Sequence, residues 1–281
     1  LRFMLFGFYP AEEHWRPAAT MAVCVAMIVA SASPVCWRKE LLYAWIAALI
    51  AMFVLMYGGV FGLPVRATRQ WGGLPLTLLL STVGLIGAFP VGVLLALGRR
   101  SKLPVIRILS VCYIELIRGV PLVTVLFMAS ILFPLLLPEG ANIDKLLRAQ
   151  VAMIMFAAAY IAEIVRGGLQ AMPRGQYEAA ESLGLGYRLT MTKIILPQAL
   201  RIVIPSLVNT SIGFFKDTTL VIIIGLFDFL TTIKASLTDP LWLAYHIEAY
   251  AFAAAAYFLF CFAMSRYGLW LEKAVSTERR A

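Results

Sequence analysis

Two adjacent opposite charges inside an apolar stretch are the most unusual chemical feature of the sequence. Lys216 and Asp217 interrupt the hydrophobic run over residues 203–230 and are followed by the hydroxyl of Thr218. A charge at the centre of a bilayer costs about 2.5–3.5 kcal/mol, so each one requires a partner or a function. The pair could bind a zwitterion, with Lys216 near its carboxylate and Asp217 near its ammonium group. Alternatively, the two charges neutralise each other and fix a helix break, which we expect near Phe215–Thr219.

Two further acidic–basic pairs recur with helical spacing at the edges of apolar runs. Glu115 precedes Arg118 by three residues, and Glu163 precedes Arg166 by three. Because residues three apart are neighbours on a helix, we expect each pair to form an interfacial ion pair. The alternative is a role in transport, with Glu115 and Arg118 in a cytoplasmic gate. Glu163 would then be a carboxylate in the translocation path that attracts an amino group.

Motifs for other chemistry do not occur in the sequence. It contains no G-x-x-x-x-G-K-[ST], H-E-x-x-H, G-x-S-x-G or G-x-G-x-x-G. We therefore expect that the chain binds no nucleotide and performs no covalent catalysis. His14 and His246 are far apart and indicate no metal site. The four cysteines lie in or beside apolar runs without C-x-x-C spacing, which is typical of small buried side chains.

Composition identifies the elements that must hold these residues. The chain has 281 residues, 62% hydrophobic and 14% charged, whereas soluble domains have about 45–50% and about 25%. These values exclude a soluble enzyme and a disordered chain, and continuous apolarity excludes an outer-membrane barrel. The predicted fold class is all-α, a polytopic membrane helical bundle. The expected spans are residues 18–36, 41–63, 74–97, 120–137, 149–165, 203–230 and 247–271.

The positions of the basic residues predict the orientation. Most of the 24 Lys and Arg residues fall after the first, third, fifth and seventh expected spans. Basic loops stay in the cytoplasm, so we expect a cytoplasmic C-terminus. The net charge of +9 is thereby explained without a nucleic-acid partner. The chain begins with an apolar stretch, Leu1–Phe8, and without Met, so we expect further sequence upstream.

The cytoplasmic segment over residues 173–197 is too polar to span a membrane and too patterned for a plain linker. We expect a short helix over Tyr177–Leu183 that ends at Gly184. A second short helix is expected over Tyr187–Leu196, stopped at Pro197.

The first of these helices carries two carboxylates and two small residues. Glu178 and Glu181 are three residues apart and share one face, with Ala179 and Ala180 beside them. Small residues beside a carboxylate would let the surface of another protein approach closely, so the helix could dock in a partner's groove. The alternative is a helix-turn-helix loop packed on the membrane surface.

This segment resembles the EAA motif of binding-protein-dependent ABC importer permeases, in which EAA is followed by Gly and then by I-x-L-P. The matching residues are Glu178, Ala179, Ala180, Gly184, Ile194, Leu196 and Pro197, all at the motif's spacing. Residues 113–121, 159–168 and 216–220 also resemble the polar amino-acid uptake branch, which includes histidine, glutamine and arginine permeases. The similarity covers residues 73–271, and the additional spans before Leu74 resemble the larger permease subunits of general L-amino acid transporters.

The resemblance implies a bacterial inner-membrane permease subunit with a type I importer core of five spans. Residues 1–72 would hold about two additional N-terminal spans, residues 73–272 the core, and residues 273–281 a cytoplasmic tail. The region from Glu178 to Gly184 would be a coupling helix that docks on an ABC ATPase subunit dimer. ATP and Mg²⁺ would bind to that partner, and this chain would hold no cofactor.

Further partners follow from the same resemblance. A second permease subunit is expected because five core spans are too few to enclose an amino-acid path. It would be a second copy of this chain in a homodimer or, as we expect, a homologous subunit in a heterodimer. A periplasmic amino-acid-binding protein would deliver the substrate, and membrane lipid headgroups or the ATPase would contact Arg174, Arg188 and Lys193. Two other functions stay open. One is an ion-coupled secondary amino-acid carrier, and the other is a scaffold that recruits a soluble partner without transport.

Two remaining groups of residues carry structural expectations. The outer-loop residues Asp228, Asp239, Glu139 and Asp144 are expected to be solvated or to form a docking rim for the binding protein. Within the third expected span, small residues allow close helix approach and a proline is expected to kink the helix. These residues are Gly84, Gly87, Ala88, Pro90 and Gly92.

Overall fold

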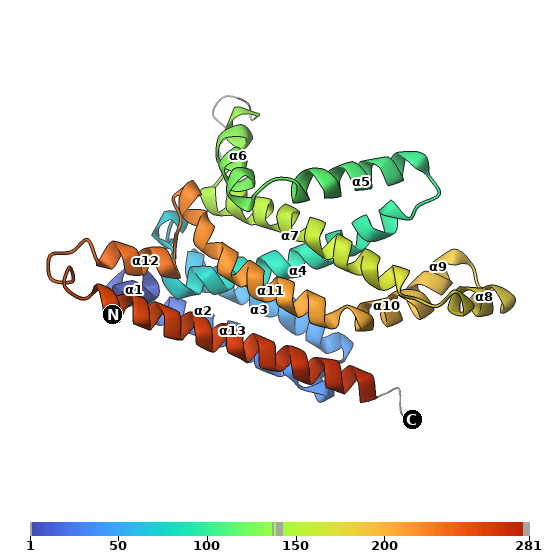
Figure 1. The fold of residues 1–281 in the computed structure, drawn as a ribbon. Coiled ribbons are helices and arrows are strands. Elements are labelled where there is room, and N and C mark those ends of the chain that lie inside the picture. The colour runs from blue at the N-terminus through green and yellow to red at the C-terminus, as the bar shows by residue number, and fades with distance from the viewer. Residues whose placement is uncertain (1, 137, 139–142, 278–281) are drawn as a thin grey trace. The chain divides into compact units, whose positions relative to one another are not determined.

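The computed structural model describes residues 2–136, 138 and 143–277, and this part of the chain is almost entirely helical (Figure 1). It divides into two compact units. Unit 1 comprises Leu1–Gly84, Pro121–Met153 and Phe214–Phe260, and unit 2 comprises Leu85–Val120, Ile154–Gly213 and Cys261–Ala281. The predicted division at residues 72 and 272 stays a prediction, and residues 278–281 of the expected tail lie outside the described residues.

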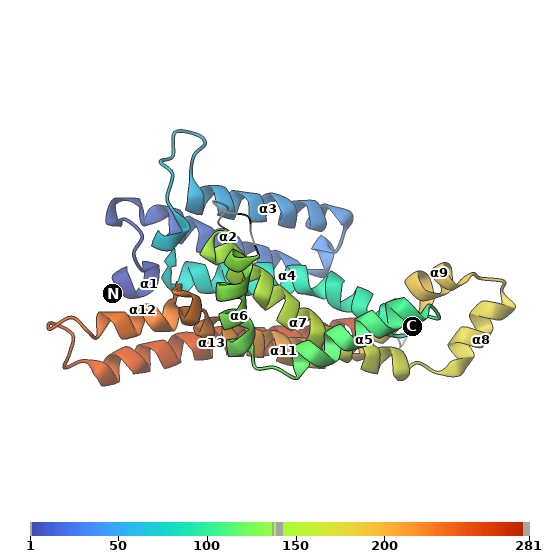
Figure 2. The same cartoon turned by 90° about the horizontal axis from the view of Figure 1, so that it is seen from above.

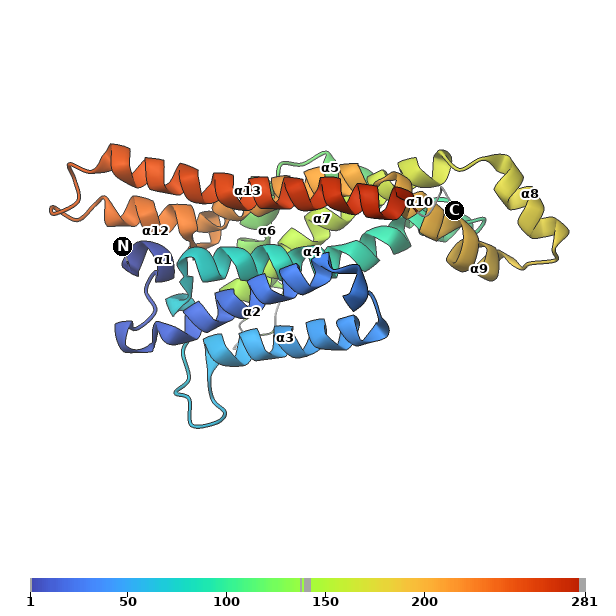
Figure 3. The same ribbon diagram turned by 90° about the horizontal axis from the view of Figure 1, so that it is seen from below.

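Unit 1 contains the N-terminal helices and several short elements. Its elements are α1 (Arg2–Phe6), η1 (Ala11–Glu13), α2 (Trp15–Ala32), η2 (Pro34–Cys36), α3 (Lys39–Tyr57), η3 (Thr68–Gln70), the start of α4 (Gly73–Arg99), α6 (Leu122–Leu135), the start of α7 (Lys145–Gln170), the end of α11 (Ile204–Asp217), η5 (Thr218–Ile224), β1 (Phe227–Asp228), α12 (Phe229–Ser236) and the first part of α13 (His246–Thr277). Helices α2 and α3 lie side by side as a hairpin (Figure 3).

A buried arginine joins the two ends of this hairpin. Arg16 of α2 is fully buried, and its Nε donates to the carbonyl of Leu55 at 2.6 Å. Its Nη1 donates to the carbonyl of Pro64 at 3.1 Å and to Glu13, which also accepts from Arg66. The buried guanidinium is stabilised by these carbonyl and carboxylate acceptors on Nε and Nη1, while Nη2 has no hydrogen-bond partner in the described part of the chain.

Unit 2 contains the other ends of the long helices and the polar segment between α7 and α11. Its further elements are the end of α4, α5 (Pro104–Arg118), the remainder of α7, α8 (Arg174–Ser182), α9 (Tyr187–Leu189), η4 (Thr190–Ile195, a π-helix), α10 (Leu196–Ile202), the start of α11 and the end of α13. Figure 2 shows α8 and α9 with the bend of the chain between them.

The expected spans are found, with one built differently. Six helical segments in the described residues are long and apolar enough to cross a membrane, which confirms the polytopic all-α fold class. In place of the run over residues 120–137, α5 ends at Arg118 and the 14-residue α6 starts after Pro121. At about 1.5 Å per residue α6 measures about 21 Å, less than the hydrocarbon core of about 30 Å. Only α5 and α6 together could form a seventh span.

Glycines in α4 allow it to pack closely against another helix of the same chain. In unit 2, a Cβ at Gly87 would lie 2.8 Å from Ile154 of α7, and one at Gly92 would lie 2.7 Å from Ile161. In unit 1, a Cβ at Gly84 would lie 2.6 Å from Phe214. The expectation of close packing is confirmed within the chain. The helix α4 continues through Pro90 without a break.

Two helical glycines should respond oppositely to alanine. Gly92→Ala is expected to destabilise the protein by about 1–3 kcal/mol because the new methyl overlaps Ile161 and the carbonyl of Ala158. Gly167→Ala in α7 meets no atom within 4 Å and should stabilise by about 0.5–1 kcal/mol through lower backbone entropy. Thermal unfolding in detergent measures both, and equal melting temperatures would contradict the prediction.

Candidate coupling and gating sites

A left-handed glycine ends the short polar helix α8. Gly184 has φ of +70°, and its N–H donates to the carbonyl of Glu181 at 2.8 Å. The N–H of Leu185 donates to the carbonyl of Ala180 at 3.0 Å, which completes a Schellman motif. The expected end of the helix at Gly184 is confirmed, and the helix begins three residues earlier than expected, at Arg174. The glycine of the motif is thus required by backbone conformation.

The exposed face of α8 differs from the expected one by one residue. Glu178, Ala179 and Glu181 are exposed, as a docking face requires. Ala180 is only 1% exposed, so it packs against this chain and does not offer space to a partner. This corrects the expectation that both alanines lie open beside the carboxylates.

The second half of the polar segment is one continuous helical stretch of changing pitch. It begins as α9 at Tyr187, becomes the π-helix Thr190–Ile195 and continues as α10. The expectation that Pro197 stops the helix was wrong. Pro197 directly follows the π-helix, where the N–H of Leu196 donates to the carbonyl of Met191 five residues back, and the helical stretch continues through Pro197 as α10. Of the remaining motif residues, Ile194 and Leu196 are half-buried.

Five charged side chains from three helices of unit 2 form a cluster, called here the Arg99–Glu163 cluster. Its members are Arg99 of α4, Glu115 and Arg118 of α5, and Glu163 and Arg166 of α7. Arg99 Nη1 lies 2.8 Å from Glu115 Oε1 and 3.4 Å from Glu163 Oε2. Arg118 Nη1 lies 3.7 Å from Glu163 Oε2, and Arg166 Nε donates to Glu163 Oε1 at 2.9 Å. Glu163 is therefore the centre of the cluster.

The pairing within the cluster corrects one expectation and confirms another. Glu163 and Arg166 form the expected i, i+3 pair. Glu115 and Arg118 do not pair with each other among the described residues, because each side chain reaches a different helix. Arg118 also lies over the ring of Tyr160, 5.7 Å from its centroid. Arg99 was not identified from the sequence, since its position at a helix end gives no indication of its partners.

The adjacent charges Lys216 and Asp217 lie in unit 1, where the expected helix break occurs. The α-helix α11 ends at Asp217 and continues as the 3₁₀-helix η5 to Ile224, where Gly225 with φ of +79° ends it. Lys216 is exposed, Asp217 is half-buried, and no ion pair joins them within 4 Å in the described part of the chain. Thr218 is buried and donates to the carbonyl of Phe215 at 2.7 Å.

Comparison with known proteins relates this chain to a family of transport proteins. The family model described as "Binding-protein-dependent transport system inner membrane component" matches residues 88–277. The chain is 54% identical over 282 residues to the Escherichia coli K12 "Inner membrane amino-acid ABC transporter permease protein YhdY", covering 98% of this chain and 76% of that protein. It is 38% identical to BztC of Rhodobacter capsulatus, a "Glutamate/glutamine/aspartate/asparagine transport system permease protein", covering 98% and 77%.

A solved structure is also similar to this chain. The "Crystal structure of an amino acid ABC transporter with histidines" matches with a TM-score of 0.64 and 31% identity, over 72% of this chain and 92% of that chain. The chain belongs to the binding-protein-dependent transport system inner membrane component family. As a member of this permease family, it is a multi-pass inner membrane protein.

One residue of this permease that was expected in a solvated outer loop is buried. Asp228 has no exposed surface and caps the N-terminus of α12. It accepts from the N–H groups of Leu230 and Thr231 at 3.0 and 3.2 Å, from the Thr231 hydroxyl, and from Tyr257 Oη at 3.4 Å. The expectation of solvation or of a docking rim was wrong for Asp228, because four donors replace its water.

The other expected outer-loop acids have different outcomes. Asp239 is exposed, as expected, and accepts from the N–H of Leu241 at 2.9 Å. Asp144 is exposed and accepts from Thr68 Oγ1 and from the N–H of Leu146. Glu139 lies outside the described residues.

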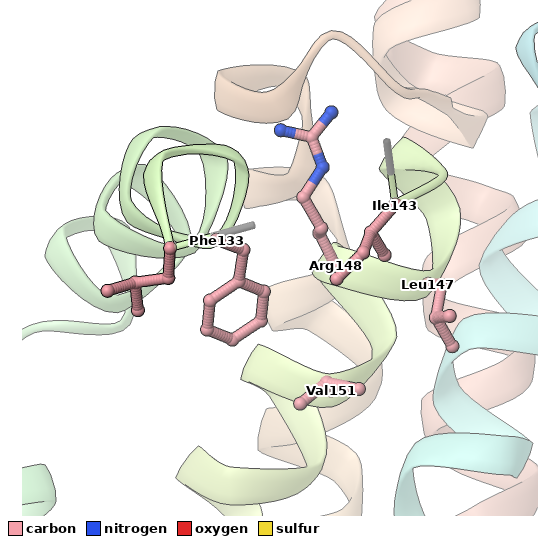
Figure 4. A pocket seen from close by; sticks show the side chains of 6 residues that line it. Phe133, Ile143, Leu147, Arg148 and Val151 are labelled. Carbon is pink, nitrogen blue, oxygen red and sulfur yellow. The ribbon is translucent and has the colours of Figure 1, made fainter. Parts of the chain in front are cut away.

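Two cavities in unit 1 of this permease contain none of the expected path residues. The first has a volume of ≈ 290 Å³ and lies among apolar residues of α6 and α7. Arg148 borders it, and its guanidinium extends away from Leu147 and Val151 (Figure 4) and donates to the carbonyl of Ser130 at 2.7 Å. The second, of ≈ 740 Å³, lies among α3, α4 and α7 and is lined mostly by apolar side chains.

Proposed function

We propose that this chain is the transmembrane permease subunit of an ATP-driven importer for L-amino acids. The observation that carries the proposal is α8, a short polar helix with exposed Glu178 and Glu181 and a glycine-fixed end at Gly184. Such a helix is a compact, rigid projection for another protein's groove. The relatives YhdY and BztC, which are named as amino-acid permeases, support the substrate class.

The proposed mechanism is alternating access driven by a partner. An ABC ATPase dimer would bind ATP and Mg²⁺, dock on α8 and move it as the dimer closes. This chain would hold no cofactor and perform no covalent chemistry. Its segment over residues 173–197 and its C-terminus would face the cytoplasm, since the basic residues gather in those loops.

Two further partners complete the proposed importer. A second, homologous permease chain would pair with this one as a heterodimer, and a periplasmic amino-acid-binding protein would deliver substrate. Membrane lipid headgroups would hold the exposed basic residues Arg174, Arg188 and Lys193 at the bilayer surface.

The charged residues have separate proposed roles. Glu115, Arg118 and Glu163 would form a gate, because inter-helix ion pairs such as theirs can open and re-form as helices move. Lys216, Asp217 and Thr218 would line the substrate path, where the change from α-helix to 3₁₀-helix places polar groups within an apolar span.

Purification in mild detergent from native membranes tests the proposal. An ATP-binding subunit and a homologous permease are expected to co-purify with the chain. Glu178→Arg should remove the ATPase because it reverses a charge on the docking face, while Glu272→Arg, also exposed, serves as the control and should retain it. If the chain purifies alone and catalyses uptake in liposomes driven by an ion gradient, it is a secondary carrier and the proposal fails.

A further inference from the structure

Arg100 connects the polar helix α8 with two membrane helices of unit 2. It follows α4 directly, and its Nη1 donates to Tyr177 Oη of α8 at 3.1 Å. The same nitrogen donates to the carbonyl of Leu169, near the end of α7, at 3.1 Å. The guanidinium also lies 5.7 Å from the centroid of the Tyr177 ring. One side chain thus contacts α8 in two ways and is itself held by α7.

Arg99, the residue before Arg100, belongs to the Arg99–Glu163 cluster. Arg99 contacts Glu115 of α5 and Glu163 of α7. Arg99 is the last residue of α4 and Arg100 follows it, so two adjacent backbone positions carry side chains that reach different neighbours. A displacement of Tyr177 would therefore move the end of α4 and with it the ion pairs of Arg99.

The residue before Tyr177 in α8 has its own attachment. Gln198 of α10 donates through Nε2 to Gln176 Oε1 at 3.1 Å and to the carbonyl of Ile194 at 2.9 Å. Gln176 and Tyr177 are consecutive, so α8 is held by α10 through one residue and by Arg100 through the next. Of these two attachments, the Tyr177 contact is the one that leads through the adjacent residues Arg100 and Arg99 to the Arg99–Glu163 cluster.

We propose that Arg100 is the positioning residue that transmits movement of α8 to the Arg99–Glu163 cluster. This inference rests on the proposed function, in which α8 docks on the ATPase. A physical connection of this kind requires contiguous contacts between elements that move, and Arg100 supplies them. Because Arg100 is exposed, solvent and salt weaken its contacts, so the expected effect is a reduced rate rather than complete loss.

The experiment uses the complete transporter in proteoliposomes, with its ATPase and its liganded binding protein. Arg100→Ala is expected to lower uptake and binding-protein-stimulated ATP hydrolysis about three- to tenfold. Basal hydrolysis, the amount of intact complex and the KM for liganded binding protein should stay unchanged, which a purely structural role would not predict. Tyr177→Phe should give an intermediate loss, because the ring remains under the guanidinium while the hydroxyl is removed.

Two comparisons make the result decisive. Combining Arg100→Ala with Tyr177→Ala should reduce uptake no further than the larger single effect, since both remove one contact. Arg107→Ala removes an exposed arginine of α5 and should match the wild type. Two outcomes would overturn this inference and leave the proposed function standing. One is that the losses of uptake in the two single variants add in the double variant. The other is that Arg100→Ala keeps wild-type uptake and stimulated ATP hydrolysis while Glu178→Arg disrupts the complex. If Glu178→Arg also couples normally, the proposed function itself fails.

Discussion

Replacing Glu163 by alanine is expected to remove most transport activity and to destabilise the folded protein by about 3 kcal/mol. Glu163 is the acceptor for Arg99, Arg118 and Arg166, and its side chain is only 21% exposed. Without it, Arg118 and Arg166 lose their carboxylate, and partly buried unpaired charges are strongly unfavourable. Uptake in proteoliposomes and thermal unfolding in detergent measure the two effects.

The second glutamate of the cluster provides the matched control. Glu115 contacts only Arg99 in the described cluster, and its side chain is 55% exposed. Glu115→Ala should therefore cost less than about 1 kcal/mol, as exposed pairs do. Glu163→Gln keeps the shape and one acceptor oxygen but removes the charge. If Glu163→Gln transports as well as the wild type, the charge of Glu163 has no role in a gate.

The second large effect is expected at Asp228, where Asp228→Ala should destabilise the protein by about 3 kcal/mol. The substitution removes a helix N-cap, typically worth about 1 kcal/mol. It also removes the buried carboxylate that accepts from the Thr231 hydroxyl and from Tyr257 Oη, at about 1–3 kcal/mol. The melting temperature in detergent measures the loss. Asp239→Ala, on the exposed aspartate of the following loop, should leave it unchanged, and equal losses would contradict the role of burial.

The buried carboxylate also predicts a pH dependence. Burial raises the pKa of Asp228 above the usual aspartate value, and the hydrogen bonds from Thr231 and Leu230 offset this only in part. A folded-state pKa above the unfolded one means that stability is lost as the pH rises through the folded value. The wild type should therefore gain stability relative to Asp228→Asn as the pH falls from 7 towards 4. A difference that does not change over this range would contradict the raised pKa.

The sequence alone determined the fold class, the irregular span and the polar segment that carries the EAA motif. Long apolar runs must form helices in a bilayer, because a helix provides hydrogen bonds to all its backbone N–H and C=O groups within one segment where no water is available. The break after Asp217 was predicted because charges and threonines interrupt one such run, and the structure changes from α-helix to 3₁₀-helix at that residue. Gly184 was predicted to end α8 because left-handed helix ends depend on the residue itself.

Features that depend on which helices meet could not be predicted. The sequence paired Glu115 with Arg118 by spacing, but Arg99 of α4 lies closer to Glu115 in the folded chain. It left Ala180 open and Asp228 solvated, whereas neighbouring elements bury both.

The physical reason is the range of the interactions. Helix propensity, capping and membrane insertion depend on residues within a few positions, so the sequence determined them. Burial and ion pairing depend on the rotation of each helix and on the partner it meets, which a single sequence does not encode locally. For this protein, the sequence alone determined a membrane helical bundle with a polar segment that carries the EAA motif. Only the tertiary structure decided that Glu163 is the centre of the charged cluster and that Arg100 connects it to α8.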